Sequence, residues 1–369
     1  MIQKRLLSTF LLTLATLLSL SAQDFEIYIS DAGNFDQPPW QILKFDQNGE
    51  NGKVFIADHL AWPQDILFLE DENAVLISNL NTGVISRFNA TTGAYIDEFA
   101  TGINGPTRMK IGPDGLLYVL QWQNTGKVLR YQLDGTFVDG FTAAGIPSSI
   151  GLDWDSEGNL YVSSYGQKYV RKFSPTGADL GLFISDNLSG PTNIWFGDNG
   201  DLYVIDYLGN GVKRFLADGT YAGVFINGLA NGEGIDFFPN GNLAIGVGAA
   251  SSVRIYDPSG NYIEELVPSG TLDLLVPNAV VFRETAVSST TEAYRELEFV
   301  TPTIGTVFEL SKPELLQPDS TIRVFDQTGK WVGNLDPVWD ASEQPAGIYH
   351  IIAKLADGAT ARQKIVVQK

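Results

Sequence analysis

Aromatic side chains stand beside amides and carboxylates at several loop positions of this sequence. The candidates share a place next to a predicted strand and are Trp62, Trp122, Asn124, Tyr165, Asp206 and Tyr207. Aromatic rings bury the apolar face of a ligand, and the polar groups fix its orientation. We therefore predict that these residues bind a glycan, a peptide or a protein. The alternative for each aromatic residue is that it only caps the end of a sheet.

A second set of residues offers oxygen ligands. Asp65, Asn193 and Glu233 fall at similar heights on different predicted strands, together with Arg108 and Asn278. Oxygen atoms of this kind suit a hard divalent cation. The sequence requires no cofactor, and Ca²⁺ or another divalent cation is the candidate for these ligands. The alternative is that Glu233 and Arg108 form a structural ion pair.

Composition excludes other kinds of chemistry. The chain has no cysteine and two histidines, His59 and His350, which rules out thiolate chemistry and a multi-histidine zinc site. The formal net charge of −19 argues against a nucleic-acid partner, because that partner requires a basic surface. The nucleophile motif Gly-Xaa-Ser-Xaa-Gly is absent. A binding role is thus favoured over catalysis.

A repeat positions these residues. Gly115, Gly158, Gly200 and Gly241 recur every 41–43 residues, each in a turn between two strand patterns. A period of 40–45 residues that contains only strand signals is typical of a β-propeller blade. The sequence therefore predicts an all-β protein built around a propeller.

Six blades are expected. Their inner strands should begin near Pro63, Pro106, Pro147, Pro191, Gly232 and Pro277. The last inner strand, 277–282, has no outer strands after it, whereas three strand patterns at 26–30, 41–45 and 53–57 have no inner strand before them. Pairing these two leftovers would close the ring and remove an exposed sheet edge.

The two ends of the chain have different patterns. Residues 1–22 have a basic start at Lys4 and Arg5 and an apolar stretch over 6–20, which predicts a secretory signal peptide. No later segment could span a membrane as a helix. The propeller should occupy 23–284 and a Ser/Thr-rich linker 285–294. Short strand patterns over 295–369 predict a small immunoglobulin-like β-sandwich.

Two family resemblances follow from specific motifs in the propeller. Residues 190–204 read Gly-Pro-Thr-Asn-Ile-Trp-Phe-Gly-Asp-Asn-Gly-Asp-Leu-Tyr-Val, and the region resembles NHL-repeat propellers. Gly232-Glu233-Gly234 and Thr192-Asn193 are similar to the metal-binding strands of gluconolactonase-like propellers. That similarity implies the alternative function, a divalent-cation-dependent lactonase or lyase at the channel mouth, where the cation would polarise the substrate.

The C-terminal region carries another resemblance. Residues 322–330 (Ile-Arg-Val-Phe-Asp-Gln-Thr-Gly-Lys), 345–349 (Pro-Ala-Gly-Ile-Tyr) and the terminal 363–369 resemble the type IX secretion sorting domain of Bacteroidetes-type bacteria. Thr301-Pro302-Thr303 replaces the usual Pro-Asn-Pro near the start. The resemblance implies that the secretion machinery recognises 295–369 and carries the protein through the periplasm and outer membrane, to be secreted or held at the cell surface. The alternative is an ordinary adhesion sandwich.

Overall fold

Short strands rich in Val, Ile, Leu, Phe and Tyr make up most of the protein, as expected for half-buried pleated sheets. The computed structural model describes residues 25–284, 295–317, 320–326, 331–357 and 359–369. The predicted signal peptide (1–22) and linker (285–294) lie outside the described residues. Contacts divide the chain into two compact units, Met1–Thr285 and Ala286–Lys369.

Within residues 25–284, six antiparallel sheets of four strands form the blades of a β-propeller, as predicted. The inner strands β4, β8, β12, β16, β20 and β24 span Pro63–Leu69, Pro106–Ile111, Ser149–Trp154, Pro191–Phe196, Gly232–Phe237 and Pro277–Glu284. The second strands β5, β9, β13, β17, β21 and β1 span Ala74–Asn79, Leu117–Gln121, Leu160–Ser164, Leu202–Asp206, Leu243–Val247 and Phe25–Asp31. Each inner strand contacts the next around the ring.

The outer half of each blade completes its sheet. The third strands β6, β10, β14, β18, β22 and β2 span Val84–Asn89, Leu129–Tyr131, Tyr169–Phe173, Gly211–Phe215, Ser252–Tyr256 and Gln41–Phe45. The fourth strands β7, β11, β15, β19, β23 and β3 span Tyr95–Ala100, Phe137–Gly140, Asp179–Ile184, Tyr221–Asn227, Tyr262–Val267 and Lys53–Ile56. The register between third and fourth strands shifts in every blade, which kinks the outer edge and discourages pairing with another chain.

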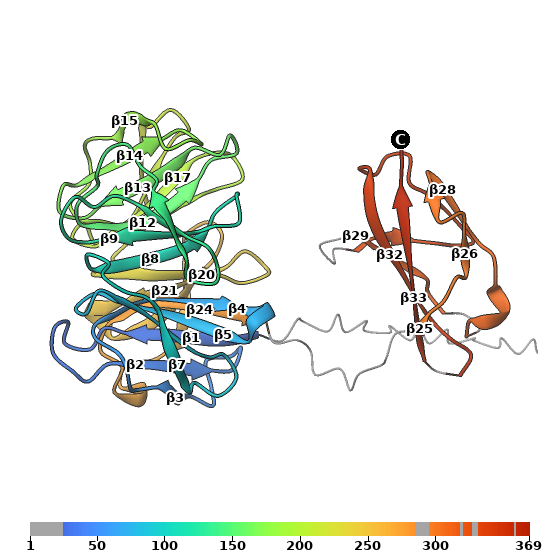
Figure 1. Ribbon diagram of the computed structural model, residues 1–369, viewed down its shortest axis with the longest axis horizontal. Coiled ribbons are helices and arrows are strands. Elements are labelled where there is room, and N and C mark those ends of the chain that lie inside the picture. Colours follow the sequence, from blue (N-terminus) through green and yellow to red (C-terminus); the bar gives the residue numbers. More distant parts are fainter. Residues whose placement is uncertain (1–24, 285–294, 318–319, 327–330, 358) are drawn as a thin grey trace, which may run out of the picture. The chain divides into compact units, whose positions relative to one another are not determined.

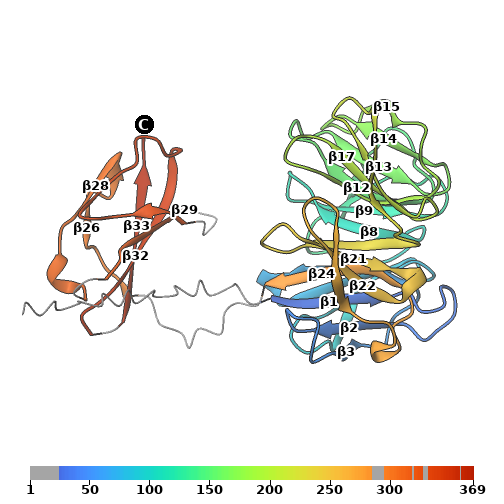
Figure 2. The ribbon, with the colours of Figure 1, turned by 180° about the vertical axis from the view of Figure 1, so that it is seen from behind.

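The two ends of the propeller sequence meet in one blade. β24 pairs with β1 over a register that runs from Phe25 opposite Glu284 to Asp31 opposite Pro277. Figure 1 and Figure 2 both show β24 beside β1, with β2 and β3 following. The predicted closure of the ring is therefore confirmed. On the other side of β24, a Cβ atom at Gly234 would come within 2.8 Å of the Ala279 carbonyl carbon, so only glycine allows β20 this close.

Short 3₁₀ turns interrupt the loops at η1 (Glu70–Glu72), η2 (Gly248–Ala250) and η3 (Thr271–Asp273). In the described part of the chain no helix is long and apolar enough to cross a membrane.

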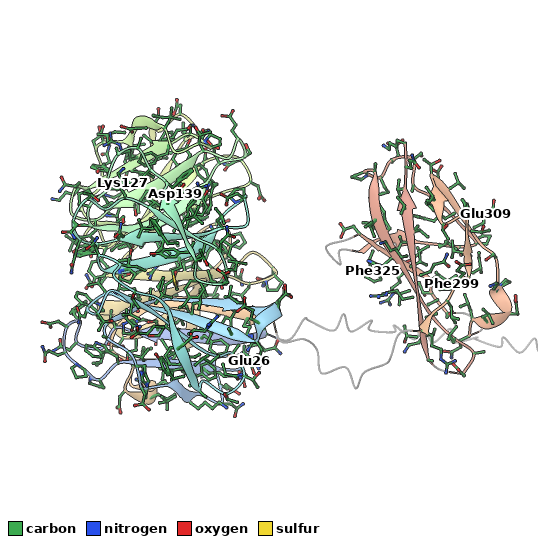
Figure 3. The ribbon with its side chains drawn as sticks, in the orientation of Figure 1. Glu26, Lys127, Asp139, Phe299, Glu309 and Phe325 are labelled. Carbon is green, nitrogen blue, oxygen red and sulfur yellow. The ribbon has the colours of Figure 1, made fainter. Side chains whose placement is uncertain are left out.

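The C-terminal unit is a small β-sandwich, as expected. One sheet contains β25 (Arg295–Glu296), β27 (Ile304–Gly305), β29 (Arg323–Asp326), β30 (Trp331–Asn334), β32 (Gly347–Lys354) and β33 (Thr360–Val367). The other contains β26 (Val300–Thr301), β28 (Val307–Leu310) and β31 (Val338–Asp340), with the 3₁₀ turn η4 (Pro313–Leu315) after β28. Phe299 and Phe308 are fully buried in its core, and Figure 3 labels Phe299 inside this unit.

Candidate functional site

A pocket of about 250 Å³, here called the axial pocket, lies where the loops meet the inner strands of the ring. Its apolar walls are formed by Ala32, Phe35, Trp62, Leu80, Trp122, Ile150, Tyr165, Tyr207 and Val276. Its polar groups come from Gln64, Thr192, Glu233 and Asn278. The site thus combines an aromatic wall with a few polar side chains, as small-ligand sites do.

The wall follows from a position repeated in every blade. The residues that come directly after the second strands are Ala32, Leu80, Trp122, Tyr165, Tyr207 and Gly248. Each donates its backbone N–H to the carbonyl of the residue directly before the inner strand of its own blade, at 2.8–3.2 Å. Six equivalent backbone hydrogen bonds therefore hold six side-chain positions around the axis, and all but Gly248 line the pocket.

The polar floor also follows from a repeat. The second residues of the inner strands are Gln64, Thr107, Ile150, Thr192, Glu233 and Asn278, and all but Thr107 line the pocket. At this point the register with the second strand shifts in all six blades. Such a bulge re-aims a side chain out of the regular alternation of a strand.

Aromatic rings occupy one side of the wall in an unbroken series. Tyr165 contacts Trp122 at 5.6 Å between ring centroids and Tyr207 at 5.9 Å. These residues come from three consecutive blades. On the remaining side, Phe35 packs edge-to-face against Trp62 at 5.5 Å. We call Trp122, Tyr165 and Tyr207 the aromatic arc.

Phe35 and Trp62 both have left-handed backbone conformations, with φ of 56° and 55°. Residue 62 precedes an inner strand, and the equivalent residues with positive φ in other blades are Gly105, Ser148 and Asn231. A bulky residue in this conformation is strained by about 1–3 kcal/mol, and such strain clusters at binding sites.

Arg108 closes the channel beneath the pocket. Its Nη2 donates to Glu233 Oε1 at 2.9 Å and to the Asn278 carbonyl, and its Nε donates to Asn193 Oδ1 at 3.1 Å. Its Nη1 donates to the Gln64 carbonyl. One buried guanidinium from β8 thus joins β4, β16, β20 and β24. The ion pair between Glu233 and Arg108, which the sequence offered as an alternative, is present.

Burial controls the titration of the groups around this guanidinium. Desolvation raises the pKa values of Glu233 and Asp65, and the charge of Arg108 opposes both shifts. Asp65 Oδ2 also accepts a hydrogen bond from the Met109 amide at 2.7 Å. Burial, with the nearby Glu233 charge, raises the pKa of Tyr207 to about 12 and raises that of Tyr165.

Four of the six predicted ligand-binding residues come together. Trp62, Trp122, Tyr165 and Tyr207 line the axial pocket, whereas Asn124 and Asp206 do not. The Asn124 side chain is exposed and donates to Asn104.

Asp206 is fully buried and has a structural environment. It accepts hydrogen bonds from the Ser189 and Gly190 amides and pairs with Lys213 at 2.6 Å. These contacts hold the loop that enters β16. The Asp206 carboxylate is occupied by them and does not line the pocket.

The residues predicted to hold a metal are arranged around Arg108. Asn193 and Glu233 each use a side-chain oxygen to accept from the guanidinium, and Asp65 accepts from a backbone amide. No cluster of three or more His, Cys, Asp or Glu side chains suited to a metal occurs in the described residues. Asn193 Oδ1 and Glu233 Oε1 are occupied by these hydrogen bonds, and too few oxygens remain for the six to eight ligands that Ca²⁺ takes. The metal site at Asp65, Asn193 and Glu233 therefore stays a prediction, and the hydrogen bonds from Arg108 weigh against it.

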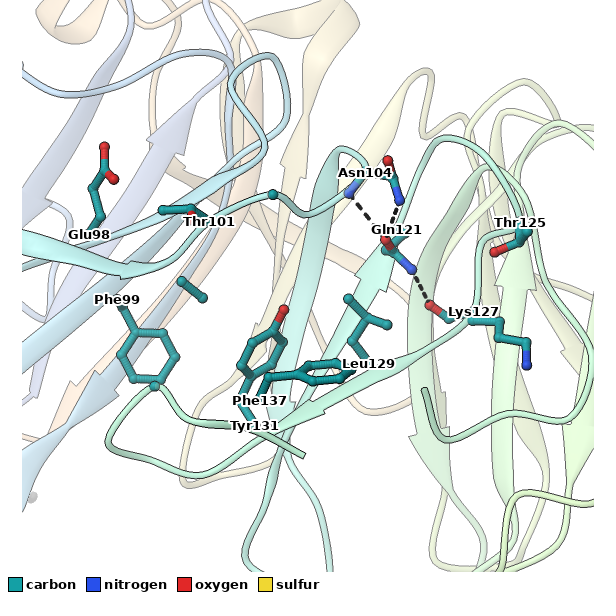
Figure 4. Close-up of a pocket in the computed structure, with 13 residues that line it drawn as sticks. Glu98, Phe99, Thr101, Asn104, Gln121, Thr125, Lys127, Leu129, Tyr131 and Phe137 are labelled. Atoms are coloured by element: carbon teal, nitrogen blue, oxygen red, sulfur yellow. Dashed lines mark hydrogen bonds between the residues drawn. The ribbon is translucent and has the colours of Figure 1, made fainter. Parts of the chain in front are cut away.

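A second hollow of about 610 Å³ lies near the outer strand β7 and the hairpin of β10 and β11. Figure 4 shows Gln121 in this groove between Asn104 and Lys127. Its Oε1 accepts from the Asn104 amide at 3.1 Å and its Nε2 donates to the Lys127 carbonyl at 2.6 Å. Both polar atoms of the Gln121 side chain thus already form hydrogen bonds within the protein. We therefore regard the axial pocket as the stronger candidate site.

No family model matches this chain, and no curated protein matches it. A chain from the crystal structure of a nidogen/laminin complex has a TM-score of 0.58 and 14% identity, covering 70% of this chain and 98% of that one. A protein of unknown function from Bacteroides caccae has a TM-score of 0.57 and 14% identity, covering 71% and 100%. A gluconolactonase from Xanthomonas campestris reaches 0.48 at 16% identity, covering 68% and 87%. The first two likenesses, both at 14% identity, establish the propeller fold alone.

Proposed function

We propose that this protein is a binding propeller that takes a small ligand group into the axial pocket. The observation that carries the proposal is the aromatic arc, because three consecutive blades place aromatic rings at a position where the other blades have Ala32, Leu80 and Gly248. A ring scaffold needs no such asymmetry. A pocket of about 250 Å³ is at the small end of ligand sites and suits one sugar ring of a glycan or one side chain of a peptide or protein.

The alternative, a cation-dependent lactonase or lyase, would use Glu233 and Asn193 as metal ligands. The hydrogen bonds from Arg108 to both residues weigh against that role. A Ca²⁺ titration followed by thermal melting tests this alternative, and we expect an unchanged melting temperature. An increase that disappears in Glu233→Ala would instead support the metal-dependent enzyme.

The test of the binding function is a glycan and peptide panel applied to the full chain. At least one glycan or peptide of the panel should bind to the wild type. We expect Trp122→Ala and Tyr207→Ala to abolish that binding. Tyr262→Ala is the matched control, because Tyr262 is an exposed aromatic residue on the outer strand β23. If both pocket variants bind as the wild type does, the axial pocket is not the ligand site.

We also propose that residues 295–369 direct export through a type IX system to the surface or the medium. Three motifs in the family order support this proposal, and they fall on or next to β29, β32 and β33. In a host with this system, deletion of 295–369 should leave the propeller in the periplasm. Unchanged secretion of the shortened chain would contradict the proposal.

A further inference from the structure

The polar floor of the axial pocket includes Asn278, whose buried side-chain oxygen is unpaired. Asn278 is 1% exposed, and its Oδ1 has no hydrogen-bond partner. Its Nδ2 donates to the Pro63 carbonyl at 2.8 Å, so the amide could not be reversed without setting two oxygens against each other. An unpaired buried acceptor is costly, and a ligand that donates to it would remove that cost.

The floor contains one carboxylate, Glu233, which is paired with Arg108 through one of its two oxygens. Glu233 uses Oε1 for Arg108, and its second oxygen accepts no hydrogen bond from any described residue. Of the described residues that line the pocket, none is Lys, Arg or His. All three nitrogen atoms of Arg108 are already engaged below the floor, so the pocket offers no free cation to an anionic ligand.

The aromatic walls of the pocket favour a cationic ligand. The faces of Trp and Tyr rings attract a cation through their quadrupoles, most strongly when water is excluded. Trp62 and the aromatic arc line the same pocket as Glu233. After burial, the Glu233 charge is the next cause of the raised pKa values of Tyr165 and Tyr207.

We propose that the axial pocket binds an organic ammonium group that carries at least one N–H. Glu233 is its counterion through Oε2, Asn278 Oδ1 accepts a hydrogen bond from its N–H, and the aromatic arc surrounds its alkyl stem. This inference rests on the proposed binding function and narrows its ligand class. The group can belong to a free amine, an amino sugar or a lysine side chain.

The test uses three probes of equal chain length with the full chain: butylammonium, butan-1-ol and butanoate. Tryptophan fluorescence reports binding, because Trp62 and Trp122 line the pocket. We expect butylammonium to bind about tenfold tighter than butan-1-ol, and butanoate to bind more weakly than either. Equal affinities for butylammonium and butan-1-ol would overturn the ammonium inference and leave the binding pocket standing.

Variants of pocket residues test which side chains cause the preference for butylammonium. Glu233→Gln should reduce the preference for butylammonium over butan-1-ol to near unity, and thermal melting checks that the variant folds. Trp122→Leu keeps an apolar wall and should also reduce that preference, which provides a second test if Glu233→Gln does not fold. Tyr262→Ala is the control and should keep the preference. A preference that survives in folded Glu233→Gln and in Trp122→Leu would overturn the inference.

Two further measurements complete the test. Glu233 is faced by Arg108, Asp65, Tyr165 and Tyr207, and as the pH falls through its raised pKa it becomes neutral, so wild-type affinity for butylammonium should weaken. An affinity that does not weaken would overturn the role of Glu233 as counterion.

Glucosamine and a lysine-containing peptide then identify the source of the ammonium group. If no probe, glycan or peptide perturbs the pocket, the proposed binding function itself fails.

Discussion

Arg108 is the residue on which the centre of the ring most depends. Its side chain is 6% exposed and forms the ion pair with Glu233, whose side chain is 11% exposed. Removal of one partner from a buried pair leaves an uncompensated charge, which costs about 3–5 kcal/mol. We expect Arg108→Met to lower the free energy of unfolding of the propeller by about this amount, measured by denaturant unfolding with tryptophan fluorescence.

The matched control is the double variant Arg108→Met with Glu233→Leu, which removes both charges. It should recover more than half of the lost stability, because apolar residues of similar size often replace a buried pair without a penalty. A double variant as unstable as Arg108→Met would show that the hydrogen bonds to the backbone carbonyls matter more than the charges.

Asp236 predicts a pH dependence of stability. Burial raises its pKa to about 6, and its Oδ2 accepts from the Phe282 amide of β24 at 2.6 Å. Because the folded-state pKa lies above the unfolded value, its contribution to stability is fully present below about pH 3.8 and is lost as the pH rises through 6. Relative to Asp236→Asn, the wild type should lose about 2.4 kcal/mol between pH 4 and pH 7. A constant difference across this range would contradict the shift.

At the scale of the element, each loop that enters an inner strand must be held in place. Asp206 does this for β16, because it accepts from the Ser189 and Gly190 amides and pairs with Lys213. Asp206→Ala leaves these buried donors unpaired and should cost about 2–4 kcal/mol by denaturant unfolding. Asp206→Asn keeps an acceptor and should cost less. Equal losses in the two variants would show that the charge, and not the acceptor, holds the loop.

The strands were predictable because their patterns repeat. Five of the six inner strands begin at the predicted residue, and β12 begins at Ser149, two residues after Pro147. The closing blade was predictable because its strands remained unpaired in the sequence pattern.

The polar centre was less predictable. Counting from turn glycines placed Asp65, Arg108, Asn193, Glu233 and Asn278 at one height, whereas Glu233 and Asn278 are second residues of their strands and the others are third residues. Adjacent strand residues differ in direction, and the bulge in each inner strand has no signal of its own in the sequence.

The residues that form the apolar wall of the axial pocket were predicted only in part. The aromatic residues were recognised because they interrupt the repeat, but Phe35, Leu80 and Val276 were missed. Phe35 comes from a long loop and itself takes a left-handed conformation, two residues after Gly33. Asp206 was chosen because it follows a predicted second strand. In fact the last residue of its strand fastens the loop, and the next residue lines the pocket.

At the scale of the whole molecule, the stability of the ring depends on the pairing of β1 with β24. Deletion of 25–56 would remove β1, β2 and β3 and expose the edge of β24. We expect this deletion to abolish the cooperative thermal transition of the whole propeller. Deletion of 295–369 is the control and should leave that transition unchanged, because the two units have separate cores. A shortened ring that still melts cooperatively near the wild-type temperature would contradict this dependence.

The same pairing imposes an order on biosynthesis. β1 is translated early, but its partner β24 leaves the ribosome only after the intervening blades, a delay on the order of 10–50 s at ordinary translation rates. Throughout that interval the nascent chain carries a sheet with an open edge that other polypeptides can join. The nascent chain is therefore exposed to edge-to-edge aggregation until the last strand arrives.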